Sequence, residues 1–306
     1  MLMSHLSLMV FLSLAVFYVA AEQKTLVVMR VFSSRKNPQW YVDGVSRDEL
    51  LRIAGPLYGK EEHKCNRQGS KLGYTGFNII DSSNDECVYV VNSVEAESYL
   101  LSTYVKFMTM KNEDPNALNS VVEHVKTVIS TGVQTELVPE SPVYPAANEV
   151  IRGPDHVANY SPDTWNLNLK ALLNNNCYNY GTDVRTDTFA QPGRGSGRMW
   201  SGSMNCTMLL DVCTRDGLIP LKSKQCPVEE QPKIGHYVSL VIWSGVDYHW
   251  YRKDAGGYWS HKPGIGNVTD IDASHNKILN PDKADITPYK EICGYFIVVP
   301  SKITIE

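Results

Sequence analysis

A cysteine and a histidine in the second half of the chain have the residue types and the order of a thiol hydrolase. Cys177 follows the polar run Asn174–Asn176, and His236 comes directly after Gly235 at the start of an apolar stretch. A thiolate is the nucleophilic form of cysteine, and a nearby imidazole can take up its proton. This order predicts cleavage of an amide by thiol attack, through a thioester that water then hydrolyses.

Two elements must position these side chains. A helix from Cys177 to about Val184 would place the thiol in its first turn, where unpaired N–H groups stabilise a thiolate and can bind an oxyanion. His236 would open a strand of a β-hairpin, with Tyr248–Arg252 as the return strand. We therefore expect a lowered pKa for the Cys177 thiol. The plainer alternatives are a buried or bridged cysteine and a strand-end histidine bonded to a backbone carbonyl.

Two residues, Asp254 and His249, could orient the imidazole of His236 as the third catalytic member. If Trp243 pairs with Val246 across a two-residue turn, Asp254 ends the return strand close to His236. His249 would then lie ~13 Å along the strand from the imidazole. We prefer Asp254 for this reason, and a bulge or a wider loop would favour His249 instead.

The N-terminus has the pattern of a secretory signal peptide. The apolar run Leu6–Ala20 ends in small residues just before the polar Glu22. We expect residues 1–21 to be removed by cleavage after Ala21, which gives an exported, soluble protein. An uncleaved anchor is the alternative, because no Lys or Arg precedes the apolar run.

The chain has seven cysteines, and cysteines of an exported protein normally pair. An odd number leaves one thiol over, and its polar surroundings favour Cys177 as the free one. Cys65 and Cys87 are expected to bridge each other. Two further disulfides are expected, with the pairing left open, among the four cysteines of the C-terminal half: Cys206, Cys213, Cys226 and Cys293.

Charge and motif content argue against several other classes of protein. A formal net charge of −4 is not typical of a nucleic-acid binder or of a basic membrane-surface protein. His249, His261 and His275 lack the spacing of metal ligands, so we expect no metal and no cofactor. No stretch after the signal peptide is long enough to span a bilayer, so no stable membrane insertion is expected. The oligomeric state is left open.

Element order predicts an α+β fold in two domains. Residues 22–131 have the order β-α-β-β-α with a trailing helix, which is typical of a small α+β domain. Residues 132–158 are rich in proline and predict a linker, or a strap on the second domain. Residues 159–306 begin with helices and end with antiparallel strands, which predicts a helix packed on an antiparallel sheet.

Local signals indicate where elements begin and end. Ser46 and Glu49 have the spacing of a capping box at a helix start. The pair Asn37-Pro38 is expected to break the first strand. The glycine-rich run 186–203 predicts a long loop. Asn267-Val-Thr269 is a glycosylation acceptor pattern, if the host is eukaryotic.

The stretches Asn-Asn-Cys177-Tyr-Asn-Tyr-Gly and Gly-His236-Tyr-Val-Ser-Leu-Val-Ile-Trp resemble the papain-like fold in NlpC-type cell-wall peptidases and CHAP-type amidases. The resemblance covers residues 159–299 and implies a peptide or cell-wall-like substrate. Two features depart from the NlpC pattern: Asn-Cys-Tyr-Asn replaces Asp-Cys-Ser-Gly, and the Pro-Gly-Asp strand before the histidine is absent.

Three functions follow from these observations. The first is a secreted cysteine peptidase or amidase with Cys177, His236 and either Asp254 or His249 at its centre. The second is a non-enzymatic secreted interaction protein, or a toxin-like one, on a papain-like scaffold. The third is an acyl or amide transferase on that scaffold. The Cys177–His236 arrangement in three dimensions is the observation that separates the first from the second.

Overall fold

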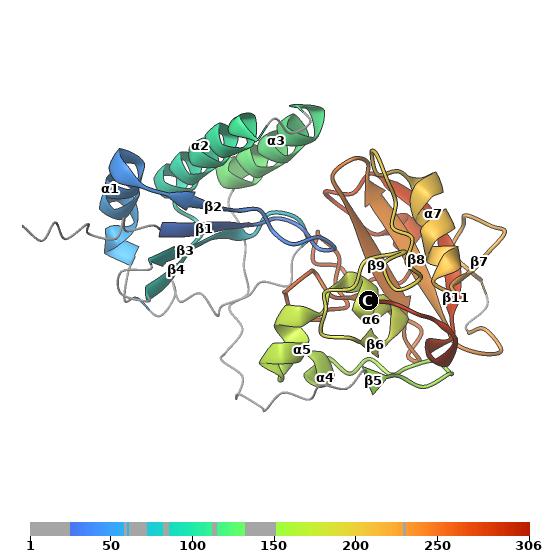
Figure 1. Ribbon diagram of the computed structural model, residues 1–306. Helices are drawn as coiled ribbons and strands as arrows, with labels where there is room; N and C mark the ends of the chain where they lie inside the picture. The colour runs from blue at the N-terminus through green and yellow to red at the C-terminus, as the bar shows by residue number, and fades with distance from the viewer. Residues whose placement is uncertain are drawn as a thin grey trace, which may run out of the picture.

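The computed structural model describes residues 25–57, 60, 72–81, 86–111, 115–131, 151–228 and 231–306. The expected signal peptide, Cys65 and most of the proline-rich segment lie outside these residues. The described part is α+β, as expected, with two larger antiparallel sheets and a two-stranded one (Figure 1). No helix in this part of the chain is long and apolar enough to cross a membrane.

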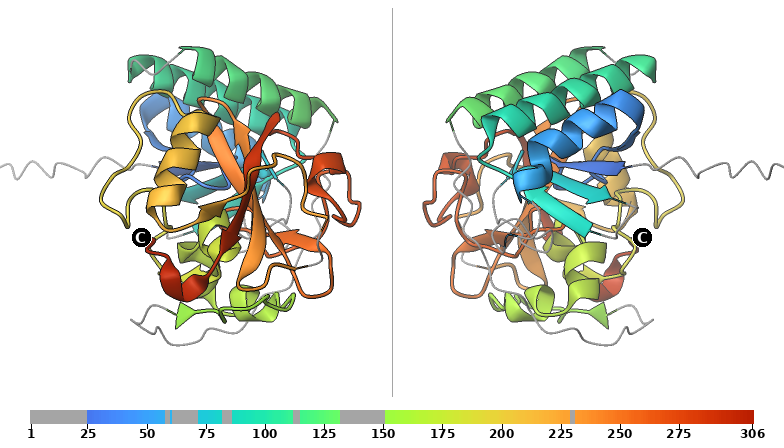
Figure 2. Two further views of the ribbon diagram at one scale, coloured as in Figure 1. Left: turned by 90° about the vertical axis from the view of Figure 1, so that its right-hand side faces the viewer. Right: turned by 90° about the vertical axis from the view of Figure 1, so that its left-hand side faces the viewer.

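The first sheet belongs to the N-terminal half and has the strand order β2-β1-β3-β4, with every neighbouring pair antiparallel. Its helices lie side by side in Figure 2. Trp40 of the sheet packs against Tyr104 of α2, with ring centres 5.4 Å apart. The strands are β1 (Thr25–Arg30), β2 (Gln39–Val42), β3 (Gly76–Asp81) and β4 (Glu86–Val90). The helices are α1 (Gly44–Ala54), α2 (Val94–Met110) and α3 (Pro115–Thr131).

One local prediction for this half holds and one is wrong. The first strand ends at Arg30, before Asn37-Pro38, and the Asn37 side chain accepts bonds from the backbone N–H groups of Val31 and Phe32 in the loop that leads to β2. Helix α1 begins at Gly44, before the expected capping box. The carboxylate of Glu49 pairs with Arg52 at 2.9 Å instead of capping the helix.

The second sheet belongs to the C-terminal half and has the order β10-β9-β8-β11-β7. Helices precede it along the chain, as expected. The strands are β7 (Ile219–Pro220), β8 (His236–Trp243), β9 (Asp247–Lys253), β10 (Trp259–His261) and β11 (Glu291–Val298). The helices are α4 (Asp163–Asn166), α5 (Leu169–Asn174), α6 (Cys177–Thr182) and α7 (Cys206–Arg215). The two-stranded sheet pairs β5 (Ile151–Arg152) with β6 (Val184–Arg185).

The two faces of the second sheet pack against different partners. Side chains alternate across a strand, so neighbouring residues face opposite ways. Val238, Leu240 and Trp250 point into a core shared with α6 and α7. Val241 and Tyr251 point into a core shared with the first sheet and with α2 and α3. The two halves are therefore joined by one continuous apolar layer.

The β8–β9 hairpin differs from the expected register by one residue. Trp243 pairs with Asp247, not with Val246, because the turn has three residues rather than two. A shift of one residue moves every side chain to the opposite face. His249 pairs with Val241 and so lies on the face toward the N-terminal half.

The loop between β1 and β2 holds the two halves together through buried polar contacts. The carboxylate of Asp247 accepts bonds from Ser33 N at 2.8 Å, from the Ser34 hydroxyl and from the Tyr289 hydroxyl at 2.8 Å. The Asn176 side chain donates to Ser34 O at 2.9 Å. These partners are far apart in the sequence, so the contacts fix the halves relative to each other.

The disulfide expectations hold only in part. Cys206 of α7 is bonded to Cys293 of β11. Cys213 and Cys226 are both free, so the second expected bridge of the C-terminal half is absent. Cys213 packs in the core between α7 and the second sheet, whereas Cys226 packs against the core on the opposite face of that sheet. Cys87 is disulfide-bonded, while Cys65 lies outside the described residues.

The glycosylation pattern is not on an open surface. The Asn267 side chain is only 8% exposed. Val268 N donates to the Asn166 side chain at 2.9 Å, which holds this segment against α4. An acceptor asparagine must be exposed to be modified, so the folded protein does not favour glycan attachment there.

Candidate functional site

Helix α6 begins at Cys177, as predicted, and asparagines cap it. The Asn176 side chain accepts bonds from Tyr178 N at 3.0 Å and Asn179 N at 3.1 Å. The Asn179 side chain in turn accepts from Asn176 N at 3.2 Å. This reciprocal arrangement is a capping box built from asparagines. It occupies two of the N–H groups that an oxyanion would need.

The thiol of Cys177 is free but fully buried. It lies in the core between α6 and the second sheet and interacts with the backbone of Trp250. Burial, and then the negative charge of Asp247, raise the pKa of the thiol well above its ordinary value. The predicted lowering of this pKa is wrong, because burial outweighs the helix terminus.

His236 opens β8, as predicted, but its ring contacts the opposite end of α6. Its Nε2 is 2.8 Å from the carbonyl oxygen of Gly181. A carbonyl only accepts, so Nε2 carries the proton, and Gly181 lies about 6 Å along the helix axis from Cys177. Burial, and then the charge of Arg252, lower the pKa of His236 to about 4. The ring is therefore neutral at pH 7, and its Nδ1 has no hydrogen-bond partner among the described residues.

The two candidates for the third position are held elsewhere. Asp254 accepts from Arg252 Nε at 2.9 Å and from the Ser260 hydroxyl. His249 lies on the other face of the sheet, where its Nε2 is 2.9 Å from Nδ1 of His261. Neither Asp254 nor His249 is hydrogen-bonded to the imidazole of His236, so the expected series of bonds from carboxylate to imidazole to thiol is not formed among the described residues. Asp254 shares a face with His236, and His249 does not.

Two buried cations organise this region, and the sequence interpretation missed both. Arg252 is 2% exposed and donates to Asp254 and Asp183, each at 2.9 Å. Lys262 is fully buried, and its Nζ donates to three backbone carbonyl oxygens at 2.6–2.8 Å. Burial lowers the pKa of Lys262 to about 7. Arg252 lies in β9 and Lys262 directly after β10, and a charged residue at such a position normally indicates an exposed side chain, so no local signal in the sequence could have identified either one.

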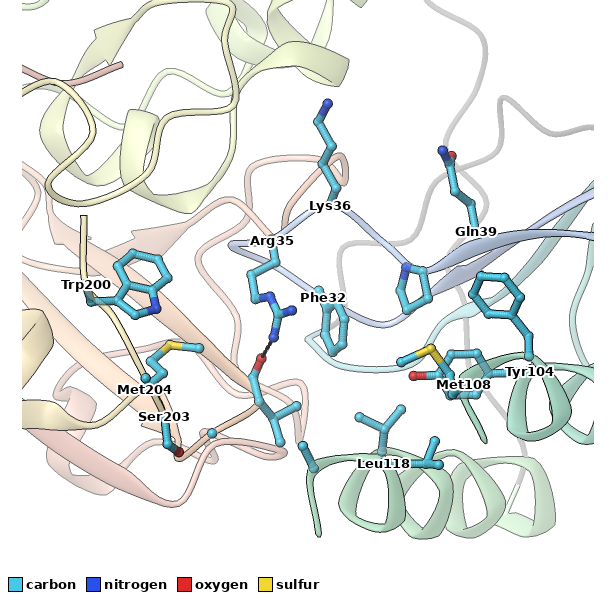
Figure 3. A pocket seen from close by; sticks show the side chains of 17 residues that line it. Phe32, Arg35, Lys36, Gln39, Tyr104, Met108, Leu118, Trp200, Ser203 and Met204 are labelled. Atoms are coloured by element: carbon cyan, nitrogen blue, oxygen red, sulfur yellow. Dashed lines mark hydrogen bonds between the residues drawn. The ribbon is translucent and has the colours of Figure 1, made fainter. Parts of the chain in front are cut away.

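A groove lies between the two halves, away from these buried residues. Its volume is about 580 Å³, and its walls come from α2, from α3 and from the segment before α7 (Figure 3). The side chains on these walls are mainly aromatic, aliphatic or methionine, as is usual for ligand pockets. The groove was not predicted, because its walls meet only after the halves pack together.

Comparison with known proteins gives one informative match. No family model matches the chain, and no solved structure matches it. Over 141 residues the chain is 40% identical to insoluble matrix shell protein 1 of Ruditapes philippinarum, an alignment that spans 90% of that protein and 46% of this chain. The chain belongs to the insoluble matrix shell protein 1 family. The match assigns no role to any residue described above.

In this member of the insoluble matrix shell protein 1 family, two histidines of the second sheet, His249 and His261, lie in a buried aromatic cluster. His249 stacks on Tyr289 with ring centres 5.6 Å apart and meets His261 edge-on at 5.0 Å. The other ring nitrogen of His261, Nε2, donates to the backbone carbonyl oxygen of Ile271 at 2.9 Å. Burial lowers the pKa of His261 to about 4 and that of His249 well below its ordinary value. These rings are therefore neutral packing groups in the folded protein near pH 7.

We expect the free energy of unfolding to fall as the pH drops from about 6.5 to 4. In this window the unfolded chain protonates its histidines, with a pKa of about 6.5, while folded His236 and His261 stay neutral. The unfolded state thus binds more protons, and stability is lost as pH falls, by about 2–3 kcal/mol per histidine. The raised pKa values of buried Asp247 and Asp254 act in the opposite direction and offset part of the loss.

Urea unfolding at pH 7.5, 6.0, 5.0 and 4.5 measures this dependence. The variant His261→Gln should show a shallower loss, because one of the linked groups is gone. A free energy of unfolding that stays constant or rises between pH 6.5 and 4.5 would contradict the assignment.

Proposed function

We propose that this chain is a secreted, non-enzymatic interaction protein of an insoluble extracellular matrix. The observation that carries the proposal is the 40% identity to a protein named insoluble matrix shell protein 1, across 90% of that protein. That name places the relative in an insoluble matrix, and the apolar N-terminus of this chain favours export. Amide hydrolysis by Cys177 stays a prediction from the sequence.

The surroundings of the expected catalytic residues support the non-enzymatic alternative. A nucleophilic thiol needs access to substrate and a lowered pKa. Cys177 is fully buried with a raised pKa, and the proton-bearing nitrogen of His236 is bonded to Gly181. Both residues match the plainer alternatives set out for them: a buried cysteine and a strand-end histidine bonded to a carbonyl.

The scaffold is part of the same proposal. Helix α6 packs on an antiparallel sheet with the cysteine in its first turn and a histidine at the start of a strand. This is the arrangement that the resemblance to papain-like proteins implies, and we retain that resemblance as a hypothesis about the origin of the C-terminal half. On this view, groups that carry out catalysis in the peptidases serve packing here.

Sequential extraction of the extracellular material of the source organism tests the proposal. The material is washed with salt, then treated with a chelator, and finally with denaturant and reductant, and each fraction is probed with an antibody against residues 151–306. We expect the chain in the last fraction, starting at residue 22. Recovery mainly in the salt wash would contradict a place in an insoluble matrix.

A second arm addresses the enzymatic alternative directly. The purified chain and its Cys177→Ala variant are incubated with bacterial cell-wall peptides, and new amino groups are counted. We expect no release above background by either protein. Release by the wild type that Cys177→Ala abolishes would restore the hydrolase.

A further inference from the structure

The groove between the halves has two apolar ends. One end is lined by Met108 of α2 and Leu118 of α3, both half-buried, and the other by Trp200 and Met204 before α7 (Figure 3). Trp200 is fixed by an edge-on contact with Tyr248, at 6.1 Å between ring centres. A volume of about 580 Å³ lies within the range of pockets that hold small molecules or short peptide segments.

The charge of the groove has a single sign. Among the seventeen described residues that line it, two are charged, Arg35 and Lys36, and neither Asp nor Glu occurs in this described set. One nitrogen of the Arg35 guanidinium donates a hydrogen bond to the backbone carbonyl oxygen of Val246 at 2.6 Å, and the group lies 5.1 Å from the centre of the Phe32 ring. Its other nitrogens have no hydrogen-bond partner among the described residues, and the residue is exposed, while its charge also acts on the buried carboxylate of Asp247. An anionic oxygen is the group that such a guanidinium binds best.

The order of these features along the groove restricts the occupant. Figure 3 shows Arg35 and Phe32 between the Met108–Leu118 end and the Trp200–Met204 end. A fatty acid carries its only carboxylate at one end of an apolar chain and would leave one apolar end empty. A peptide can place apolar side chains on both sides of an acidic one. Exposed Gln39 and Ser203 add polar groups at the walls that suit peptide backbone amides.

We propose that this groove binds an extended peptide segment of a partner protein, with apolar side chains on both sides of a glutamate or aspartate. The apolar ends supply most of the affinity by removing aromatic and aliphatic surface from water. Arg35 and Lys36 select the acidic residue and orient the segment. Peptide binding by this groove is a separate property from location in an insoluble matrix, and it can be measured on the purified protein in solution.

Fluorescence anisotropy with a labelled, end-capped peptide tests the proposal. The probe has the sequence Leu-Phe-Ser-Glu-Ser-Phe-Leu, and the matched peptides replace Glu with Gln or Lys. We expect saturable binding to the full mature chain, weakened on the order of fivefold or more by the Lys peptide, because a like charge would face Arg35. Dodecanoate serves as a competitor that represents the fatty-acid alternative.

Variants of the protein locate the site. Leu118→Arg at one end and Trp200→Ala at the other should each weaken binding on the order of tenfold. The first puts a long charged side chain into an apolar end of the groove, and the second removes the aromatic ring that forms the other end. Lys36→Glu should weaken it about threefold, as expected for one exposed charge. The matched controls are Met110→Arg and Lys106→Glu, exposed substitutions on α2 outside the groove, which should leave affinity unchanged.

Circular dichroism and thermal melting confirm that each variant is folded. The proposal is overturned by no saturable binding up to 1 mM peptide, by equal affinity for the Glu and Lys peptides, or by unchanged affinity in both wall variants. Tighter binding of dodecanoate than of any peptide would also overturn it. None of these outcomes bears on the extraction experiment, so the two proposals can fail separately.

Discussion

Replacing Arg252 with methionine should lower the free energy of unfolding by about 3–5 kcal/mol, because it breaks a buried ion cluster from one side. The guanidinium donates to Asp254 and Asp183, each at 2.9 Å, and to the Tyr180 hydroxyl at 3.0 Å. It also lies 4.1 Å above the Tyr180 ring. Without it, the buried carboxylate of Asp254 keeps only the Ser260 hydroxyl as a side-chain partner among the described residues.

Urea unfolding of wild type and Arg252→Met at pH 7 measures this loss. The matched control is Arg215→Met on α7, where an exposed pair with Asp211 at 2.9 Å is removed. That change should cost about 0.5 kcal/mol or less, as is usual for surface pairs on a helix. A loss below about 1 kcal/mol for Arg252→Met would mean that the carboxylates are not held by this cation in solution.

The second large effect is expected at Asp247, where the two halves meet. Asp247→Ala leaves three buried donors without their acceptor: Ser33 N, the Ser34 hydroxyl and the Tyr289 hydroxyl. An unsatisfied buried donor costs about 1–3 kcal/mol, so we expect a total loss of about 3–5 kcal/mol. Asp247→Asn keeps one accepting oxygen and should lose less.

Thermal and urea unfolding measure the loss, and limited proteolysis shows where it acts. Because these bonds join the β1–β2 loop to β9, the variant should be cut faster in that loop than the wild type. Asp43→Ala is the matched control, since its side chain makes no capping bond to α1. Equal stability of Asp247→Ala and Asp43→Ala would contradict a role for Asp247 in joining the halves.

Much of the α+β fold follows from local patterns in the sequence. Apolar periodicity shows which face of an element is buried, and it is therefore a reliable signal for single elements. It predicted β1, α2, α3 and the hairpin of β8 and β9, and the structure has all of them. The start of α6 at Cys177 was also predicted, from the asparagine before it. These features depend on neighbours within a few residues.

The rest depends on contacts between distant residues. The turn after Trp243 has three residues, and that one extra residue moves His249 to the other face of the sheet. The pKa of Cys177 depends on its burial under the second sheet, which no neighbour in the sequence reports. The groove beside Trp200 exists only because the halves share a core. Residue types and their order therefore suggested a catalytic site, while burial and register decide whether it assembles.

We propose that Cys177 is a buried packing residue and not a nucleophile, and the reactivity of its thiol tests this most directly. Two other free thiols provide internal references: Cys213 is fully buried and Cys226 is half-buried. Iodoacetamide labelling of the native protein from pH 6 to 9, followed by peptide mapping, gives the rate at each thiol. Protein that remains folded by circular dichroism is used throughout, for wild type and for His236→Ala.

We predict that Cys226 is labelled first, that Cys177 is as slow as Cys213, and that His236→Ala leaves the pH profile of Cys177 unchanged. This follows from the burial and raised pKa of Cys177 and from the bond between His236 and Gly181. Rapid labelling of Cys177 already at pH 6, with a rate that drops in His236→Ala, would contradict the claim and show a reactive cysteine–histidine pair.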